Sequence, residues 1–264
     1  MSKSSVSGVQ NKVVIVTGCS SGIGLATARL FLDRQALVFG IDVGAIPQKL
    51  ADEHNTFTFH RANLTNSGAV DEAVSQCHQQ YGRVDVLVNC AGVSDGWSSA
   101  DSIHEDEWER VMAINLTVPI RLMKAVLPFM KDQKGGAIVN VASKAGVSGA
   151  AAGIAYTASK HGLVGATKNV AWRFHQDGIR CNGVLPGGVA TDIASSVQMD
   201  HFDPAGFNAF FPIVQMHVSK DSEGTPVPVI GVDDVARGIA FLASDESKMI
   251  NGALIPIDNA WSTI

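Results

Sequence analysis

Apolar, β-branched runs alternate with longer stretches of helical periodicity along most of the chain. Short apolar runs predict strands over residues 12–18, 36–42, 56–64, 84–92, 136–143, 179–189 and 253–257. Apolar residues spaced three and four apart predict helices over residues 22–34, 67–81, 108–130, 154–175 and 232–243. Strands that alternate with helices in this way form βαβ units. The pattern therefore predicts an α/β fold, in which a doubly wound parallel sheet carries helices on both faces.

No linker, repeat or low-complexity block divides the chain. We therefore expect one domain over residues 12–264, preceded by a disordered lead-in over residues 1–11 that lacks the apolar core of a signal peptide. Residues 191–230 are long and irregular for a connection between a strand and a helix. A loop of that length inside a compact domain is usually functional, so we interpret it as a lid over the substrate.

Composition excludes several classes of function. Apolar residues make up 46% of the 264 residues and charged residues 17%, which is ample for a large buried core. The net charge is −5 and no block of lysine or arginine occurs, so we expect no binding to nucleic acid or to an anionic membrane. No apolar run approaches the length of a membrane span.

The four cysteines, Cys19, Cys77, Cys90 and Cys181, are scattered along the chain without a C-x-x-C pair. We expect these thiols to be reduced and mostly buried, as in a reducing compartment, and the predicted location is the cytoplasm. The histidines show neither metal-ligand spacing nor clustering in the sequence. No metal site is predicted.

A glycine-rich turn, TGCSSGIG at 17–24, joins the first predicted strand to the first predicted helix. Gly18, Gly22 and Gly24 permit a tight turn, close approach of a phosphate and close packing of the helix on the strand. A pyrophosphate there would meet free N–H groups and the positive end of the helix dipole. A plain turn is the alternative, but the strand before and the helix after favour a dinucleotide site.

Asp42 ends the second predicted strand, near the expected spacing from the glycines. Its carboxylate can accept hydrogen bonds from the ribose hydroxyls, and it repels a 2′-phosphate. Neither Ser21 in the turn nor Val43 after the aspartate supplies the cation that such a phosphate needs. We therefore predict NAD as the cofactor rather than NADP. A cap at the end of the strand is the alternative role for Asp42.

Tyr156 and Lys160 are four residues apart in YTASKHGL, so on a helix they share one face. They are either a surface pair or a general acid/base whose pKa a neighbouring cation lowers. An ordinary tyrosine, with a pKa of about 10, is a poor base at neutral pH. A cation nearby favours the phenolate and brings the pKa toward the working range. His161 lies on a different helical face from Tyr156, and we expect it to have no catalytic role.

With these residues in place, the chain resembles the short-chain dehydrogenase/reductase superfamily over nearly its whole length. The motifs that carry the resemblance are TGCSSGIG (17–24), Asn89-Cys90-Ala91-Gly92, Asn115 in MAINLT, Ser143 in NVAS, the pair Tyr156 and Lys160, and PGGVAT (186–191). The resemblance implies a single-domain Rossmann fold of about seven strands and NAD(P)-dependent oxidation of alcohols or reduction of carbonyls. It also implies a homo-oligomer, a tetramer or dimer joined through helices 108–130 and 154–175. The chain is similar in character to members from fungal secondary metabolism.

The resemblance assigns roles to four catalytic residues. Tyr156 would be the general acid/base, and Lys160, together with the positive nicotinamide ring, would lower its pKa while holding the nicotinamide ribose. Ser143 would donate a hydrogen bond to the same substrate oxygen. Asn115 would hold a water that connects Lys160 to solvent. The alternative for Asn115 is a helix-bending amide bonded to the backbone, which is compatible with that role.

The family pattern also places the cofactor. Val189 and Thr191 would fix the carboxamide, and Asn63, where the family often has aspartate, can still accept from the adenine amino group. The residues expected to bind the cofactor are Gly18, Ser21, Gly22, Ile23, Gly24, Asp42, Asn63, Leu64, Asn89, Ala91, Gly92, Tyr156, Lys160, Pro186, Gly187, Val189 and Thr191. In the C-terminal segment IDNAWSTI (257–264), Asp258 is not followed by the glycine pair that is common in the family. This departure concerns only the conformation of the local turn and the packing of the tail.

Two segments are expected to set substrate specificity. The small residues of 146–155 leave room for a bulky substrate. The lid at 191–230 is rich in apolar side chains, namely Met199, Phe202, Phe207, Phe210, Phe211, Ile213, Val214 and Met216. Neither segment holds a cluster of cations for a carboxylate or phosphate. We predict a hydrophobic, ring-containing alcohol or ketone, terpenoid-like or steroid-like; packing at a subunit interface is the equal alternative for the lid.

Two other functions stay open from the sequence. One is a cofactor-binding regulator or scaffold without catalysis, although such a protein is expected to have lost one of the catalytic polar groups. The other is a lyase or cyclase that uses the same pocket without net hydride transfer. Because Asn115, Ser143, Tyr156 and Lys160 are all present, an NAD-dependent alcohol dehydrogenase or ketone reductase is the leading interpretation.

Overall fold

Seven parallel strands form the central sheet of the computed structural model, which describes residues 8–220, 222–224 and 226–263. The strands are β1 (Val13–Thr17), β2 (Leu37–Asp42), β3 (Phe57–Arg61), β4 (Val86–Asn89), β5 (Gly136–Val141), β6 (Ile179–Pro186) and β9 (Leu254–Ile257). Their order across the sheet is β3-β2-β1-β4-β5-β6-β9, so the direction of winding reverses between β1 and β4. The predicted doubly wound α/β fold of about seven strands is confirmed.

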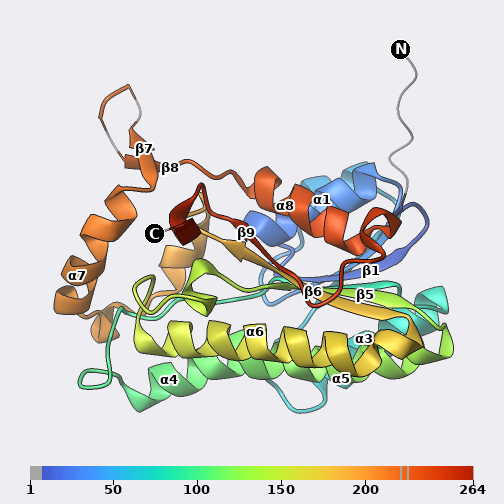
Figure 1. Cartoon of the computed structure of the whole chain (residues 1–264). Helices are drawn as coiled ribbons and strands as arrows, with labels where there is room; N and C mark the ends of the chain where they lie inside the picture. Colours follow the sequence, from blue (N-terminus) through green and yellow to red (C-terminus); the bar gives the residue numbers. More distant parts are fainter. Residues whose placement is uncertain (1–7, 221, 225, 264) are drawn as a thin grey trace.

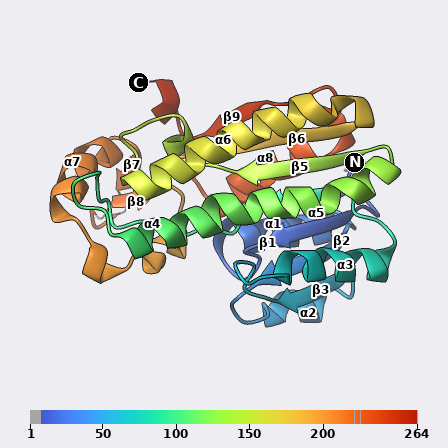
Figure 2. The same ribbon diagram turned by 90° about the horizontal axis from the view of Figure 1, so that it is seen from below.

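Helices cover both faces of the sheet (Figure 1). One face carries α1 (Gly22–Asp33) and α8 (Val232–Ala243), and the other carries α3 (Ala69–Tyr81), α5 (Val118–Asp132) and α6 (Ile154–Phe174). Figure 2, seen from below, shows α5 and α6 running side by side in front of the strands. The short helix α2 (Gln48–Glu53), which the hydrophobic pattern did not predict, lies between β2 and β3.

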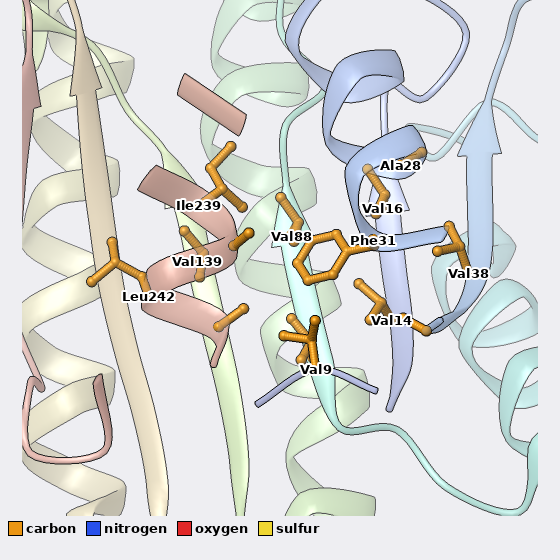
Figure 3. Packing of buried hydrophobic residues seen from close by; sticks show 14 of the residues in the cluster. Val9, Val14, Val16, Ala28, Phe31, Val38, Val88, Val139, Ile239 and Leu242 are labelled. Carbon is orange, nitrogen blue, oxygen red and sulfur yellow. The ribbon is translucent and has the colours of Figure 1, made fainter. Parts of the chain in front are cut away.

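Alternation along the buried strands divides the core into two layers. Val14 and Val16 of β1 face the layer under α1 and α8, whereas Val13 and Ile15 face the opposite layer. Phe31 of α1 is fully buried and lies among these valines (Figure 3). Because both faces of the sheet are covered, the central strands β1 and β4 are apolar at all but their last position, which is why they appear in the sequence as continuous apolar runs.

The predicted helix 108–130 is part of one longer helical run. It consists of α4 (Glu105–Met112), a π-helical segment (Ala113–Thr117) and α5. Pro119 lies in the first turn of α5, directly after the π-helical segment, and Pro128 lies inside the helix without ending it. By length and composition alone this run could cross a membrane, which the sequence reading did not anticipate. In the fold, its inner face packs against the sheet.

The segment 191–230, predicted to be irregular, contains a helix and a hairpin. Helix α7 (Pro204–Gln215) begins where the Asp203 carboxylate accepts hydrogen bonds from the N–H groups of Ala205 and Gly206, at 2.9 and 3.1 Å. The hairpin pairs β7 (Val218–Lys220) with β8 (Pro226–Pro228). An aspartate followed by proline is a helix-start signal that the sequence reading missed.

The predicted lead-in over residues 1–11 was wrong at its end. Val9 is only 1% exposed and packs in the layer under α1 and α8 (Figure 3). The backbone N–H of Asn11 donates to the carbonyl of Gln35 at 2.9 Å. The remainder of the lead-in, residues 1–7, lies outside the described residues. A single valine between polar residues gave no periodic signal, so its burial was not visible in the sequence.

Replacing Val9 by alanine tests this contact. We expect the free energy of unfolding to fall by about 1–2 kcal/mol, because two buried methyl groups are lost and a small cavity remains. The matched control is Val147→Ala, because Val147 is 46% exposed and its truncation is expected to change stability by less than about 0.5 kcal/mol. Denaturant unfolding measures both. Equal effects of the two substitutions would show that Val9 is not part of the core.

Candidate active site

A cavity of about 580 Å³ lies at the carboxyl ends of the strands, beside the point where the winding reverses. It brings together every predicted cofactor-binding and catalytic residue except Asn89 and Asn115. Those that line it are Gly18, Ser21, Gly22, Ile23, Gly24, Asp42, Asn63, Leu64, Ala91, Gly92, Ser143, Tyr156, Lys160, Pro186, Gly187, Val189 and Thr191. Residues far apart in sequence meet here because parallel strands all end at the same edge.

The glycine-rich turn forms a cradle that side chains could not enter. A Cβ on Gly24 would lie 1.9 Å from the carbonyl oxygen of Gly18, and one on Gly18 would lie 2.9 Å from the Cα of Ala91. Gly18 and Gly22 both have positive φ, 71° and 52°. Ser21 precedes α1 without capping it by a side-chain hydrogen bond. The first N–H groups of α1 therefore stay available, which fits the pyrophosphate of a dinucleotide.

Asp42 is held rigidly at the wall of this cavity. Its carboxylate accepts hydrogen bonds from the N–H groups of Ser20 and Gly44, at 2.9 and 2.8 Å. Each oxygen keeps a further lone pair that a ribose hydroxyl could use. The sheet also places Arg61 opposite Asp42, and its guanidinium donates to the carbonyl of Val43 at 3.0 Å. Arg61 was not predicted as a cation near the cofactor, because only the pairing of β2 with β3 brings it beside Asp42.

Tyr156 and Lys160 lie on α6 and both line the cavity, so the interpretation as a surface pair was wrong. Lys160 is 4% exposed, and its Nζ donates to the carbonyl of Val141 at 3.0 Å. The same Nζ lies 5.3 Å from the centre of the Tyr156 ring. The ammonium is thus held between the end of β5 and the phenol, next to Gly92, where a Cβ would lie 3.6 Å from it.

Burial dominates the ionisation of both groups. It raises the pKa of Tyr156 to about 12, an effect that interaction with the Ser143 hydroxyl partly opposes and that the charge of Asp95 reinforces. Burial lowers the pKa of Lys160 to about 8. The expected lowering of the Tyr156 pKa is therefore absent from the protein by itself, because the cost of removing a phenolate from water exceeds the opposing effect of the Ser143 hydroxyl.

Ser143 follows β5 and faces the cavity with its backbone extended. Its Oγ accepts a hydrogen bond from the N–H of Ala145 at 3.1 Å. This contact uses a lone pair of Oγ, so the hydroxyl proton can be donated toward the Tyr156 phenol, whose pKa the interaction lowers, or to a group in the cavity. Ser143 and Tyr156 thus offer two hydroxyl groups on the same wall, an arrangement suited to a substrate oxygen on which negative charge develops.

Asn115 is fully buried in the π-helical segment rather than in the cavity wall. Its side chain accepts from the N–H of Val93 and donates to the Val93 carbonyl, both at 2.9 Å, and it reaches Ser159 Oγ at 3.3 Å. The amide therefore ties the loop after β4 to the helical run. This is the alternative that the sequence left open, with the bonds made to a loop rather than within the helix.

Two predicted cofactor ligands are arranged differently from the expectation. Asn89 does not line the cavity: its side chain is 2% exposed and donates to Asn140 of β5 at 2.8 Å. The side-chain carbonyl of Asn63 was expected to accept from adenine. It accepts from the N–H and the hydroxyl of Thr65, at 3.1 and 2.8 Å. Alternation along β4 turns the Asn89 side chain into the protein, which spacing alone could not show.

The wall opposite the cradle differs from the one predicted. No residue of 146–155 lines the cavity, and of the eight apolar lid residues only Phe210 does so. Trp97, after β4, also lines it and was missed. Its ring meets those of Phe207 and Phe202 edge-on, with centroids 5.1 and 5.8 Å apart. The substrate wall is therefore an aromatic contact between the 94–98 loop and the lid.

The lid also brings histidines together that are distant in sequence. The rings of His104 and His201 stack with centroids 4.2 Å apart and planes inclined by 10°, and Asp106 lies 3.6 Å from His201. These three residues have donor types that can hold a metal ion. Parallel rings do not aim both imidazole lone pairs at one point, so we assign no metal here. His161 is exposed and contacts the Thr157 carbonyl at 3.0 Å, away from the cavity.

The comparisons with known proteins place the chain in a family. A family model described as short chain dehydrogenase matches residues 12–201. Short chain dehydrogenase adrF of Penicillium rubens is 50% identical, over 97% of this chain and 99% of that protein. Asnovolin H dehydrogenase nvfC of Aspergillus novofumigatus is 48% identical, over 96% of this chain and 97% of that protein.

A solved structure extends the agreement to the whole fold. The crystal structure of levodione reductase matches with a TM-score of 0.83 and 28% sequence identity, covering 97% of this chain and 99% of that one. The family model accounts for the strands and turns that build the cradle and the catalytic wall. The chain therefore belongs to the short-chain dehydrogenase family, which confirms the resemblance carried by its motifs, and its similarity to fungal members is confirmed as well.

Proposed function

We propose that this protein is an NAD(H)-dependent oxidoreductase of fungal secondary metabolism that interconverts a secondary alcohol and a ketone on a hydrophobic, ring-containing molecule. The observation that carries the proposal is the single cavity that holds Ser143, Tyr156 and Lys160 beside the glycine cradle and Asp42. Membership of a family that uses nicotinamide cofactors supports the class of reaction. When bound, the cofactor supplies or accepts the hydride.

The chain's own contribution is control of a proton and of charge at the substrate oxygen. In oxidation, Tyr156 takes the proton of the hydroxyl; in reduction, it gives a proton to the oxygen on which charge develops. Ser143 donates a hydrogen bond to the same oxygen and stabilises that charge. Because burial raises the pKa of Tyr156 to about 12, the tyrosine is a proton donor in the protein by itself.

Lys160 has the position for two tasks. Its ammonium lies beside the phenol, where it stabilises the phenolate formed after proton donation. It also lies beside Gly92 and the Val141 carbonyl, on the cavity wall where a nicotinamide ribose would be bound. Burial lowers the pKa of Lys160 to about 8, so the protonated fraction of this lysine changes with pH just above neutrality. Asn115 supports this wall by fixing the loop after β4.

The substrate class follows from the wall that faces this chemistry. Trp97 and Phe210 line the cavity, and Phe202 and Phe207 pack behind Trp97. Flat aromatic side chains favour contact with an apolar ring system over a small polar substrate. One relative is named as the dehydrogenase of asnovolin H, which supports a specialised small-molecule substrate for this chain as well.

Replacing Tyr156 by phenylalanine tests the proposed reaction. We expect turnover to fall by about 100-fold or more, because only the proton donor is lost, while NADH binding changes little. The measurement is NADH absorbance with a panel of ring-containing and small acyclic alcohols and ketones. The chain's other tyrosine gives a matched control: Tyr81 bonds to Thr58 at 2.7 Å, outside the cavity, so Tyr81→Phe is expected to keep wild-type turnover.

Each result of that assay points to one function. Full activity of Tyr156→Phe contradicts the mechanism. Tight NADH binding by the wild type without turnover of any compound favours a regulator or scaffold. Product formed without a change in NADH absorbance favours a lyase or cyclase. Preference for small acyclic substrates contradicts the proposed role of the aromatic wall.

Cofactor choice is tested at Asp42. We expect the wild type to bind NADH more tightly than NADPH, and Asp42→Ala to lose about 10- to 100-fold in NADH affinity, because hydrogen bonds to a carboxylate are lost. Asp52→Ala is the control, since Asp52 is exposed on α2 outside the cavity. An equal or stronger wild-type preference for NADPH contradicts the proposal. In that event, loss of NADPH affinity in Arg61→Ala would identify the cation.

A homo-oligomer through α5 and α6 is also part of the proposal. The two helices form a groove between them that is lined mainly by apolar residues, including Leu127, Ala166 and Val170. Ile120 beside it is 44% exposed. We expect light scattering to give a multiple of 27.8 kDa, and Leu127→Glu to reduce it to the monomer mass. Met249→Glu is the control, since Met249 is 88% exposed elsewhere. A monomeric wild type contradicts this interface.

A further inference from the structure

The helix that carries Tyr156 does not cap its own N-terminus. The residue before α6 is Gly153, which has no side chain to accept from the first N–H groups. Uncapped N–H groups at a buried helix end cost stability unless another part of the chain accepts from them. Here the loop after β4 supplies the acceptors, and the N–H of Ile154 donates to the carbonyl of Ser98 at 2.8 Å.

The main acceptor is Asp95, a residue that no catalytic motif of this chain includes. Its carboxylate accepts from the N–H of Gly153 at 3.1 Å and from the N–H of Tyr156 itself at 2.8 Å. Asp95 is completely buried, and its partners lie 58 and 61 residues further along the chain. A buried carboxylate at a helix N-terminus is also stabilised by the helix dipole. The backbone of the catalytic tyrosine is thus bonded directly to this charge.

The Asp95 carboxylate lies so close to Gly153 that no side chain fits at position 153. A Cβ on Gly153 would lie 2.6 Å from one oxygen of Asp95 and 2.7 Å from the other. A second buried acid, Glu107 of α4, holds the same loop from the other side by accepting from the N–H of Gly96 at 2.8 Å and from Ser98 Oγ at 3.1 Å. The loop is therefore clamped, and its position determines where α6 begins.

The clamped loop also carries the wall of the substrate cavity. Trp97 lies two residues after Asp95, has a φ of 63° that is rare for a bulky residue, and lines the cavity. The carbonyl of Gly96 accepts from the N–H of Asp203 in the lid at 2.7 Å. One short loop thus contacts the substrate wall, the lid and the backbone of Tyr156.

We propose that Asp95 is a positioning residue for the reaction, which sets both the place of the Tyr156 phenol and the charge that it meets. This inference rests on the proposed function. The groups that face the phenol are Ser143 after β5, Cys90 after β4, Lys160 on the same helix, and Asp95. Asp95 is the carboxyl group among them: burial raises its pKa, and the N–H groups of Tyr156, Trp97 and Gly153 that donate to it oppose this rise and favour the carboxylate.

A direction of effect follows from this charge. A carboxylate near the phenol disfavours the phenolate, so removing the charge lowers the pKa of Tyr156. Oxidation needs the phenolate, so its rate reaches half of its maximum at a lower pH when that pKa falls. A residue that only holds the fold in place would change the rate or the stability without moving this acidic limb.

The test compares three variants of the full-length protein with the wild type, using the alcohol that the wild type oxidises best. In Asp95→Asn one N–H of α6 loses its acceptor and the charge is removed, so we expect kcat to fall about 10- to 100-fold and the acidic limb to move to lower pH. Gly153→Ala pushes on the carboxylate but keeps its charge, so kcat should fall without that movement. Glu107→Gln alters a second buried acid whose hydrogen bonds go to Gly96 and Ser98 and not to the backbone of Tyr156, so its acidic limb should stay in place.

NADH affinity and the unfolding transition report whether each variant is folded. If Asp95→Asn is folded and either keeps wild-type kcat or loses it with an unmoved limb, the inference is wrong. If Asp95→Asn does not fold, Gly153→Ala decides: wild-type kcat in that variant overturns the inference, and a loss of kcat with intact NADH affinity supports it. Failure of the proposed function looks different, because the wild type would then show no turnover or Tyr156→Phe would be fully active.

Discussion

The contact between the start of α1 and the ends of β1 and β4 is the constraint on which the rest of the site depends. Gly24 and Gly18 approach so closely that a Cβ would lie 1.9 Å from a carbonyl oxygen, and Gly18 meets Ala91 with similar closeness. No side chain can enter this contact, so the backbone N–H groups of α1 remain facing the cavity. The same contact brings the loop after β4 next to the glycine turn. That loop in turn bonds to the backbone of Tyr156 through Asp95 and lines the cavity through Trp97.

Buried polar side chains fix the position of this loop by hydrogen bonds to its backbone. Asn115 bonds to both backbone groups of Val93, and Glu107 bonds to Gly96. Asn89 and Asn140 join β4 to β5 beneath the cavity, at 2.8 Å. Buried polar groups are costly unless they are paired, and nearly all of these are paired with backbone or with one another. Their pairing makes the loop rigid, and a rigid loop is what an accurate hydrogen-bond geometry at the substrate oxygen requires.

Burial gives the catalytic pair its chemical character. Removal from water raises the pKa of Tyr156 and lowers that of Lys160, so burial shifts each ionisation equilibrium toward the neutral form. Because both side chains are buried away from water, a charge that enters the cavity changes their pKa values strongly. A positive nicotinamide ring is such a charge, and it would act on the tyrosine in the direction that oxidation needs. The aromatic wall of Trp97 and Phe210 keeps the same region apolar.

Periodicity and motif spacing were sufficient to predict the parallel sheet, its helices and the main site residues, because each depends on local pattern or on the common edge where parallel strands end. Val9, Asn89, Asp95 and Trp97 could not be found in this way. Their roles depend on which elements pack together: burial under α1, alternation along β4, and a hydrogen bond to Tyr156 across 61 residues of chain. The sequence by itself determined the fold class, the family and the residue types that the cavity brings together. The tertiary structure decided how the tyrosine is held and which surface its substrate meets, because contacts between distant segments are set by packing and not by local pattern.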